Sequence, residues 1–498
     1  MKLSKEQEDI FWHWINTKYN LLIAASAGSG KSFILLKLLE IVDNKTLFLA
    51  FNKSIQEDLQ SKIDSRGLKK GKALTIHSLG LMAVRNFNPK IDIKNNKNFD
   101  LVNKLQKENP TYFKMKWEEK LKLTYSLLDI LDISRMFLTD NLKEIKQWLV
   151  TMDKVVTITP KLEVLWKKLL KLRDDSYKAH VLVVDFLDMI YLPVKLNLPI
   201  PIDPTYLFID EAQDLNLCQH KIIEKLRQQT VKRVCIVGDR KQSIYSFSGA
   251  LNNSFDMFLD IPNTIELPLN TCYRCPKKVI DKANEVYDVM SYGIPNEGVI
   301  KTVDESHIEN IEDKSMIVCR NSKPLFELYF QLLYHNKSCY IKGDDILESM
   351  IKFLTPLKYL TVREAGANMK NELLKIVKEK TQESEIRKHI LREKMSLFDI
   401  LSKHFAADIF TLVDTIIIKL KTLFFVKDDA IVLCTIHKAK GLEADIVYIL
   451  NENLIPSKRA KTREQLIQEK NLKYVARTRA KNTLYFLNID YEEDYEDY

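Results

Sequence analysis

The chain has 498 residues, of which 46% are hydrophobic, a length and composition that suggest three or four structural units with apolar cores. Its 76 Lys and Arg residues outnumber its 67 Asp and Glu residues, and the net charge of +9 suits a polyanionic partner. The first residues lack the apolar core of a secretion signal, and no run approaches the roughly 20 apolar residues that cross a bilayer, so we expect neither a secreted nor a membrane-spanning protein.

Alternating strand-like and helix-like runs in the first half of the chain predict a parallel, doubly wound α/β sheet. The first strand leads through a glycine-rich turn into an apolar-periodic helix at residues 31–42. Between about residues 81 and 189 the pattern changes to long helical periodicity rich in Lys, Leu and aromatic residues, which predicts a helical insertion. The predicted strands are residues 21–24, 46–51, 73–76, 206–210, 233–237 and 264–267.

The second half of the chain repeats this organisation as a second α/β fold. A helix-rich, highly charged stretch interrupts it from about residue 343 to residue 426. Residues 491–498 form an acidic run that we expect to be disordered. The predicted strands of this fold are residues 315–319, 431–435, 445–450 and 483–488.

The seven cysteines, an odd number, lie mostly in apolar runs, and this pattern predicts buried, reduced thiols. Cys272 and Cys275 form a CxxC pair, but a four-ligand zinc or iron–sulfur site needs a second pair, which the sequence lacks nearby. We therefore expect two incidental thiols around Arg274 rather than a metal site.

A glycine-rich loop between the first strand and its helix has the composition and position of a phosphate-binding loop. Small residues let backbone N–H groups surround a phosphate, Lys31 can reach the β- and γ-phosphates, and Ser32 can offer its hydroxyl to Mg²⁺. The usual GxxxxGK(S/T) pattern begins with Gly, where this chain has Ala. The loop is Ala25-Ser26-Ala27-Gly28-Ser29-Gly30-Lys31-Ser32.

Two adjacent carboxylates follow the apolar run at residues 206–209. Asp210 at the strand tip can hold Mg²⁺ through water, and Glu211 can act as the base toward an attacking water. A P-loop ATPase needs both groups at the carboxyl edge of its sheet. The sequence therefore predicts ATP and Mg²⁺ as cofactors.

With these motifs in this order, the chain resembles the superfamily 1A helicases of the UvrD/Rep/PcrA type, and the resemblance extends from Gln7 to about Phe486. It implies that Gln7 reads the edge of adenine. It also implies that Gln242, within the run from Val237 to Tyr245, senses the γ-phosphate.

Three further residues enter through the resemblance. Arg274 is similar to the arginine of the family's fourth motif, and Arg479 is similar to its arginine finger. The resemblance implies that both guanidinium groups reach the transferring phosphate across a cleft, and that Glu443 contacts the ribose. Closing and opening of such a cleft would drive movement along a bound strand.

The resemblance implies an α/β protein with two RecA-like P-loop parallel-sheet domains, 1A and 2A, each interrupted by a helical insertion. The expected parts are residues 1–84 (first part of 1A), 85–190 (helical insertion 1B), 191–264 (second part of 1A), 265–342 (first part of 2A), 343–426 (short helical insertion 2B), 427–490 (second part of 2A) and 491–498 (acidic tail).

Single strands that are bound without sequence preference need a positive groove and aromatic platforms for the bases. The resemblance implies contacts with single-stranded DNA at eight positions. Two departures from the family bear on DNA binding: Phe247-Ser248 stands where Trp-Arg is usual, and Ala444 stands where an aromatic residue is usual. The expected contacts are Phe51, Asn52, Lys53, His77, Tyr245, Phe247, His437 and Lys438.

The resemblance implies an ATP-dependent DNA helicase that moves 3′ to 5′ on single-stranded DNA and acts at single/double-strand junctions in repair, recombination or replication. The second insertion is short for the family, so a translocase that displaces proteins without efficient unwinding is the alternative. A clamp that only binds ATP would need neither Glu211 nor the two arginines. We expect the protein in the cytoplasm or at the nucleoid, or in the nucleus or a viral factory if the source is eukaryotic or viral.

Overall fold

The structure is a computed structural model that divides into two compact units, each with its own sheet. The first unit comprises residues 1–274, 287–293 and 460–471, and the second comprises residues 275–286, 294–459 and 472–498. Only the backbone is described for residues 117, 118, 247 and 421–423. The described residues are 3–42, 44–152, 154, 156–342, 350–378, 388, 391, 392, 394, 395, 398, 399, 401–403, 405–423, 429–458 and 460–490.

The first unit is built on a six-stranded sheet in which all strands run parallel, in the order β3-β2-β6-β7-β1-β8. Every residue of β2 and β7 is buried, as expected for parallel strands that are covered on both faces. The strands are β1 (Asn20–Ala25), β2 (Thr46–Ala50), β3 (Gly71–Thr75), β6 (Tyr206–Ile209), β7 (Arg233–Gly238) and β8 (Thr264–Leu269).

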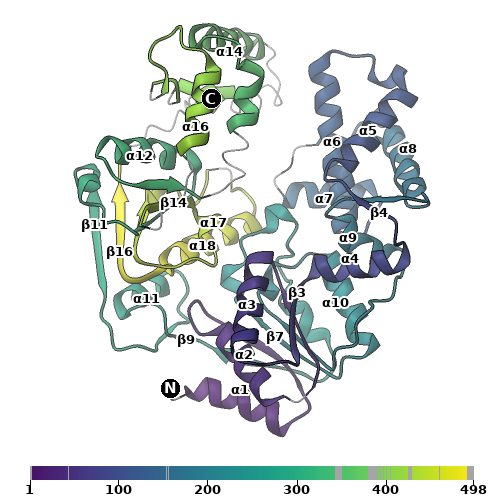
Figure 1. The fold of residues 1–498 in the computed structure, drawn as a ribbon, viewed down its shortest axis with the longest axis vertical. Coiled ribbons are helices and arrows are strands. Elements are labelled where there is room, and N and C mark those ends of the chain that lie inside the picture. The colour runs from purple at the N-terminus through teal and green to yellow at the C-terminus, as the bar shows by residue number, and fades with distance from the viewer. Residues whose placement is uncertain are drawn as a thin grey trace. The chain divides into compact units, whose positions relative to one another are not determined.

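Helices cover both faces of this sheet (Figure 1), and alternate residues of its strands belong to the apolar clusters on opposite faces. In β7, Cys235 belongs to the apolar cluster on one face, and Val234 and Ile236 belong to the cluster on the other. The first face carries α1 (Lys5–Asn16), α2 (Lys31–Ile41) and α3 (Lys53–Ser65), and the second carries α4 (Ile76–Phe87), α9 (Asp188–Lys195) and α10 (Leu217–Gln229).

Between β3 and β6 the chain forms a helical insertion with its own apolar cluster. The insertion also contains a short parallel pair, β4 (Ile91–Ile93) and β5 (Leu182–Val184), that the sequence did not predict. A buried ionic network joins the insertion to the start of α9: Arg135 donates to Asp185 (2.7 and 2.8 Å) and to Asp188 (3.0 Å). The helices are α5 (Lys97–Glu108), α6 (Trp117–Met136), α7 (Leu142–Thr151) and α8 (Pro160–Ser176).

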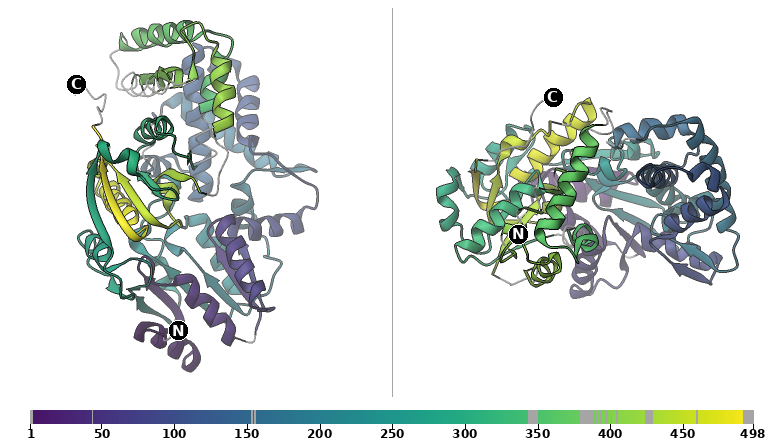
Figure 2. Two further views of the ribbon diagram at one scale, coloured as in Figure 1. Left: turned by 60° about the vertical axis from the view of Figure 1, so that its left-hand side comes forward. Right: turned by 90° about the horizontal axis from the view of Figure 1, so that it is seen from above.

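The second unit is built on another parallel six-stranded sheet, in the order β11-β16-β15-β12-β14-β13. The long strands β11 and β16 run side by side, as both ribbon figures show (Figures 1 and 2). The strands are β11 (Val299–Asp304), β12 (Met316–Cys319), β13 (Cys339–Ile341), β14 (Ile431–Thr435), β15 (Ala444–Leu450) and β16 (Ala480–Asn488).

Helices of the second unit include α12, which packs against β12, β13 and β14, and α11, which contacts β11 and β16. Residues 271–272 and 291–292, which both belong to the first unit, form the short parallel pair β9–β10. The elements are β9 (Thr271–Cys272), β10 (Ser291–Tyr292), α11 (Lys277–Asn284), α12 (Ser322–Tyr334), α14 (Val362–Val377), α16 (Val413–Leu423), α17 (Ile436–Ala439) and α18 (Arg463–Arg477).

The structure confirms the predicted fold class of two parallel-sheet α/β folds, and each of the ten predicted strands has a counterpart. The strands β11 and β13 were not predicted. The expected boundary after residue 264 falls within β8, which pairs with β1, and the first unit continues to Arg274. Part of the predicted insertion at residues 343–426, and all of the acidic run at residues 491–498, lie outside the described residues.

The seven cysteines are buried thiols outside any disulfide, as predicted. Burial raises the pKa of Cys319 to about 12, so this thiol stays protonated. In the part of the chain that the structure describes, no helix is both long enough and apolar enough to span a bilayer.

Candidate nucleotide and DNA sites

The phosphate-binding loop joins β1 to α2 at the carboxyl edge of the first sheet. Gly28 (φ +68°) and Gly30 (φ +89°) adopt left-handed conformations that residues with a Cβ rarely adopt. Gly28 also has no room for a side chain, because an added Cβ would lie 2.6 Å from the Cβ of Arg274. Within the loop, the hydroxyl of Ser29 donates to the carbonyl of Ser26 (2.8 Å). The N-terminus of α2 follows directly and offers its positive end to a phosphate.

Lys31, Ser32, Asp210 and Glu211 meet at this edge of the sheet. The two carboxylates follow β6, which is two strands away from β1 in the sheet. The Nζ of Lys31 lies 2.6 Å from Oε1 of Glu211, and the Ser32 hydroxyl donates to Oδ2 of Asp210 at 3.3 Å. Two motifs that are 178 positions apart in sequence therefore form one constellation.

Charge interactions at this constellation oppose the effect of burial on Lys31. Burial lowers the pKa of a lysine, but the carboxylates of Glu211, Asp210 and Asp239 outweigh it and hold the Lys31 pKa above its ordinary value. Burial, followed by the negative charge of Glu211, raises the pKa of Asp210 to about 6. The lysine therefore stays a cation, and Asp210 is mostly ionised at neutral pH.

The residues present fit a bound Mg²⁺. Among the described residues, no three His, Cys, Asp or Glu side chains cluster as a complete metal site. Mg²⁺ in nucleotide sites needs less from the protein, because substrate phosphates and waters supply most of its ligands. The Ser32 hydroxyl and the Asp210 carboxylate are in hydrogen-bond contact and are oxygen donors of the kind Mg²⁺ prefers.

A buried glutamine links Glu211 to the segment that follows β7. Gln213 is 1% exposed, its Nε2 donates to Oε2 of Glu211, and its Oε1 accepts from the N–H of Asp239 at 3.0 Å. The carboxylate of Asp239 in turn accepts from the amide of Gln242 at 2.7 Å. The candidate base and the candidate γ-phosphate sensor thus belong to one hydrogen-bonded chain. Nothing in the sequence indicated a role for Gln213.

The structure places Gln7 and Arg274 against the phosphate-binding loop. Gln7 is 4% exposed and forms a capping box with Ser4 in the first turn of α1. Its Nε2 lies 3.8 Å from the position of a Cβ on Gly30. The backbone N–H of Tyr273, next to Arg274, donates to the carbonyl of Gly28 at 2.8 Å.

Two predicted nucleotide contacts belong to the second unit. Arg479 is 1% exposed, and its guanidinium donates to the carbonyls of Val475 (2.9 Å) and Leu442 (3.2 Å). These bonds fix the direction of its side chain. Glu443, which follows Leu442, forms an ion pair with Lys481 at 2.8 Å.

Arg477 is the neighbouring alternative to Arg479 in the same motif. Its guanidinium pairs with both oxygens of Glu452 (2.8 and 2.9 Å) and donates to the carbonyl of Lys282 (2.7 Å). This arginine is held in an ion pair with Glu452 within the second unit, whereas Arg479 donates to the uncharged oxygens of Val475, Leu442 and Thr478.

The candidate DNA contacts form two aromatic stacks in the first unit. Phe51 and Tyr245 stack with ring centroids 5.6 Å apart and planes 15° apart. His77 stacks on Phe186 at 3.9 Å and 21°, and Phe186 is 57% exposed. Phe186 was not predicted, because one aromatic residue in an apolar stretch carries no signal of its surroundings. Burial lowers the pKa of His77 to about 4, so the ring is uncharged at neutral pH.

The other candidate DNA contacts lie outside the two aromatic stacks. Asn52 caps α3 by accepting from the N–H of Ile55 at 2.9 Å, and the exposed Lys53 pairs with Glu57 at 3.4 Å. His437 and Lys438 lie in α17 of the second unit, where burial lowers the pKa of His437 to about 3. The side chain of Phe247 lies outside what the structure describes. The list of predicted DNA contacts thus divides between the two units.

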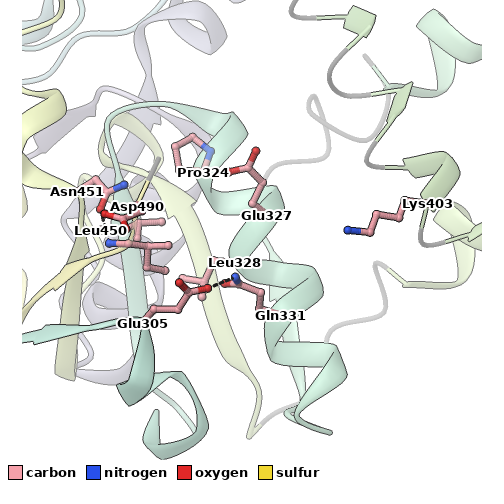
Figure 3. Close-up of a pocket in the computed structure, with 10 residues that line it drawn as sticks. Glu305, Pro324, Glu327, Leu328, Gln331, Lys403, Leu450, Asn451 and Asp490 are labelled. Carbon is pink, nitrogen blue, oxygen red and sulfur yellow. Dashed lines mark hydrogen bonds between the residues drawn. The ribbon is translucent and has the colours of Figure 1, made fainter. Parts of the chain in front are cut away.

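A cavity of about 360 Å³ in the second unit contains none of the predicted site residues (Figure 3). It lies where β11, β15 and β16 end, and Glu305, Asn451 and Asp490 line it there. The amide of Gln331 donates to Glu305 at 2.7 Å, and Lys403 faces the cavity from another segment.

A comparison with protein families decides the family of this chain. The model of the UvrD/REP helicase N-terminal domain matches residues 3–261, just over half of the chain. The chain belongs to the UvrD/REP helicase family. The match contains the phosphate-binding loop, the acidic pair and both aromatic stacks, so these residues lie within a UvrD/REP-type N-terminal domain.

Curated UvrD/REP-type relatives match parts of this chain. The ATP-dependent DNA helicase Rep of Buchnera aphidicola is 28% identical over 294 residues, which cover 53% of this chain and 42% of the relative. The Rep protein of a second Buchnera strain is 25% identical over 67% of this chain and 53% of its own length. The ATP-dependent DNA helicase PcrA of Leuconostoc citreum is 35% identical over 22% of this chain and 16% of its own length. The matched part thus spans about half or less of each relative.

A solved structure of a viral helicase also aligns with the chain. The alignment with Arterivirus nonstructural protein 10 covers 95% of this chain and 60% of the viral chain, at 12% sequence identity and a TM-score of 0.35. This score is too low to bear on the fold.

Proposed function

We propose that this chain is an ATP-dependent DNA helicase that moves along single-stranded DNA, 3′ to 5′, and acts at single/double-strand junctions. One observation carries the proposal: in a member of the UvrD/REP family, Lys31, Ser32, Asp210 and Glu211 form one constellation at the carboxyl edge of a parallel sheet. Repair, recombination and replication are the processes that need such an activity.

The constellation suits hydrolysis of the bond between the β- and γ-phosphates. Glu211 takes a proton from the attacking water as the water oxygen bonds to the γ-phosphorus, and the bond to the bridging oxygen breaks to give ADP and phosphate. The cations of Lys31, Arg274 and Arg479 stabilise the negative charge of the transferring group. Mg²⁺, when it is bound by Ser32 and Asp210, neutralises part of the charge on the phosphates.

The two aromatic stacks support the DNA part of the proposal. Phe51 directly follows β2, and Tyr245 lies in the segment after β7 that also contains Gln242. A base that stacks on such platforms contributes roughly 1–3 kcal/mol without sequence preference. Because Tyr245 is three residues from Gln242, movement at the γ-phosphate can pass to the DNA contact over a short distance.

Hydrolysis measured with and without single-stranded DNA tests the proposal. DNA should stimulate phosphate release by the wild-type chain, and Lys31→Ala should lower the stimulated rate by about 10²-fold or more. Lys37→Ala is the matched control, because Lys37 lies on the same helix and pairs only at the surface with Glu40. A Lys31→Ala variant that hydrolyses ATP like the control would show that ATP is not hydrolysed at this site.

The second candidate is a translocase that displaces bound proteins without opening duplexes efficiently. It is favoured by the second helical insertion, expected at residues 343–426, which is short for the family. Two substrates separate the candidates. A duplex with either a 3′ or a 5′ single-stranded tail measures unwinding, and a protein-coated single strand measures protein displacement. Efficient unwinding by the isolated chain would rule out the second one, and RNA versions of both substrates would test the nucleic-acid preference.

A further inference from the structure

Glu6 makes three hydrogen bonds with a segment that is far away in sequence. Its Oε2 accepts from the N–H of Asn270 (2.9 Å), the N–H of Thr271 (3.0 Å) and the hydroxyl of Thr271 (2.9 Å). The bond to Asn270 spans 264 positions. Bonds to a carboxylate are roughly twice as strong as bonds between neutral groups. One oxygen atom thus anchors the segment that leads from β8 to Arg274.

The same segment is joined to the phosphate-binding loop on its other side. The N–H of Ser26 donates to the carbonyl of Leu269 (2.9 Å), and the Ser26 hydroxyl donates to Oδ1 of Asn270 (2.7 Å). Further along, the N–H of Tyr273 donates to the carbonyl of Gly28 (2.8 Å). The backbone that carries Arg274 is therefore held between the loop and the first turn of α1.

The neighbouring residue on α1 faces the nucleotide site. Gln7 is buried beside Gly30 and Ser4, whereas Glu6 is partly exposed and directed at the segment from Asn270 to Thr271. Gln7 thus contacts the phosphate-binding loop, and the preceding residue, Glu6, contacts the segment that leads to Arg274. A capping or solubilising role for Glu6 would need neither the three donors nor their convergence on one oxygen.

We propose that Glu6 is a positioning residue for Arg274: it holds the segment from Asn270 to Thr271 so that the guanidinium meets the γ-phosphate. This inference rests on the proposed function. Glu6 itself touches no reacting atom. Its loss should impair steps that need the γ-phosphate and spare the binding of ADP.

Four variants and a double variant test the inference through DNA-stimulated hydrolysis and nucleotide binding. Glu6→Ala should lower kcat by about 10–100-fold and should weaken binding of a non-hydrolysable ATP analogue more than binding of ADP, because the guanidinium of Arg274 is no longer held toward the γ-phosphate. Glu6→Gln keeps an acceptor oxygen and should recover most of the rate. Glu8→Ala removes an exposed acid from the same helical turn and should behave as wild type. Arg274→Ala should match the Glu6→Ala defect or exceed it.

Non-additivity decides whether Glu6 acts through Arg274. The double variant Glu6→Ala/Arg274→Ala should be no slower than Arg274→Ala alone, since residues that act as one unit show strongly coupled effects. If the two losses multiply, or if ADP affinity falls as far as affinity for a non-hydrolysable ATP analogue, the inference is wrong. If Glu6→Ala does not fold, Thr271→Val removes one of the three bonds and reports on the same coupling.

The inference and the proposed function fail in different ways. A wild-type chain without DNA-stimulated hydrolysis contradicts the proposed function, and the ATP-analogue binding of Glu6→Ala then still tests the positioning role. An active wild-type chain with an equally active Glu6→Ala variant contradicts only the positioning role.

Discussion

Glu211 carries backbone strain at the centre of the candidate site. Its φ of 53° places a non-glycine residue in the left-handed region, which costs roughly 1–2 kcal/mol. The surroundings hold it there: its N–H donates to Oδ1 of Asp210 at 2.9 Å, and its carboxylate contacts Lys31 and Gln213. The strained turn directs the carboxylate toward the lysine of the phosphate-binding loop rather than along the strand.

Glu211→Gln should abolish the base without removing the nucleotide site. We expect kcat to fall by about 10²–10⁴-fold, while ATP still binds, because the amide is nearly the same size but takes no proton at neutral pH. Single-turnover hydrolysis and binding of a fluorescent nucleotide measure the two effects. Glu224→Gln, an exposed residue of α10, is the control. Equal rates for the two variants would exclude Glu211 as the base.

His220 gives the first unit a defined sensitivity to acid. The ring is buried in α10 beside Ser254 (2.9 Å), and burial lowers its pKa to about 4. The unfolded chain takes up a proton below pH 6.5, whereas the folded chain resists protonation down to about pH 4. This contribution to stability is present above pH 6.5 and is lost as the pH falls toward 4.

The loss should reach about 2 kcal/mol at pH 5, where the unfolded histidine is mostly protonated. Urea unfolding of wild type and His220→Gln at pH 7 and pH 5 measures it, because glutamine keeps a hydrogen-bonding group but does not titrate. The variant should lose less stability between these pH values. The same pH dependence in both chains would show that other groups account for it.

At the scale of residues, the sequence predicted side chains that belong to local motifs. Lys31, Ser32, Asp210 and Glu211 could be named because each motif is contiguous and its chemistry follows from its residue types. Glu6 and Phe186 could not, because their partners are defined only by tertiary contacts. A glutamate in the first turn of a helix is usual at any helix N-terminus, so Glu6 carried no distinguishing signal.

At the scale of elements, the close approach of α4 and α9 depends on a glycine. An added Cβ on Gly80 would clash with the backbone carbonyl oxygen of Met189, which cannot rotate away as a flexible side chain could. The helix α4 also carries His77, so its packing against α9 helps to place the stack of His77 on Phe186. The helix needs glycine for packing, not for its backbone conformation.

Gly80→Ala should lower the free energy of unfolding by about 1–3 kcal/mol, the usual cost of overpacking. Gly366→Ala is a control of opposite sign, because nothing lies within 4 Å of its added Cβ inside α14. There alanine should stabilise the helix by about 0.5–1 kcal/mol. Unfolding curves in urea compare the two. If Gly80→Ala were as stable as wild type, α4 and α9 would have to be less closely packed than described.

Burial also explains which strands the sequence predicted. The central strands β7 and β12 are buried along their whole length and form unmistakable apolar runs. The edge strand β11 exposes four of its six residues to a large degree, and its sequence Val-Ile-Lys-Thr-Val-Asp has no matching run. The pair β4 and β5 has three residues in each strand and leaves too short a pattern to read.

At the scale of the whole molecule, each sheet has its own apolar core, and the two halves of the predicted ATP chemistry divide between the units. Gln7, Lys31 and Glu211 belong to the first unit, and Glu443 and Arg479 belong to the second. The sequence predicted two folds because strand patterns occur twice. It placed the boundary at residue 264 rather than Arg274, since a strand's run does not reveal which sheet it joins.

If residues of both units act on one nucleotide, hydrogen exchange should depend on the γ-phosphate. ADP with Mg²⁺ should protect the loop at residues 26–32, because binding to the native state suppresses local opening. A non-hydrolysable ATP analogue should add protection around Arg479, whose side chain is the candidate contact for the γ-phosphate. Lys31→Ala should lose both effects, and Arg479→Ala should lose only the second. Protection confined to the first unit with both nucleotides would contradict a role for Arg479 in hydrolysis, because a cation that never senses the γ-phosphate cannot stabilise its transfer.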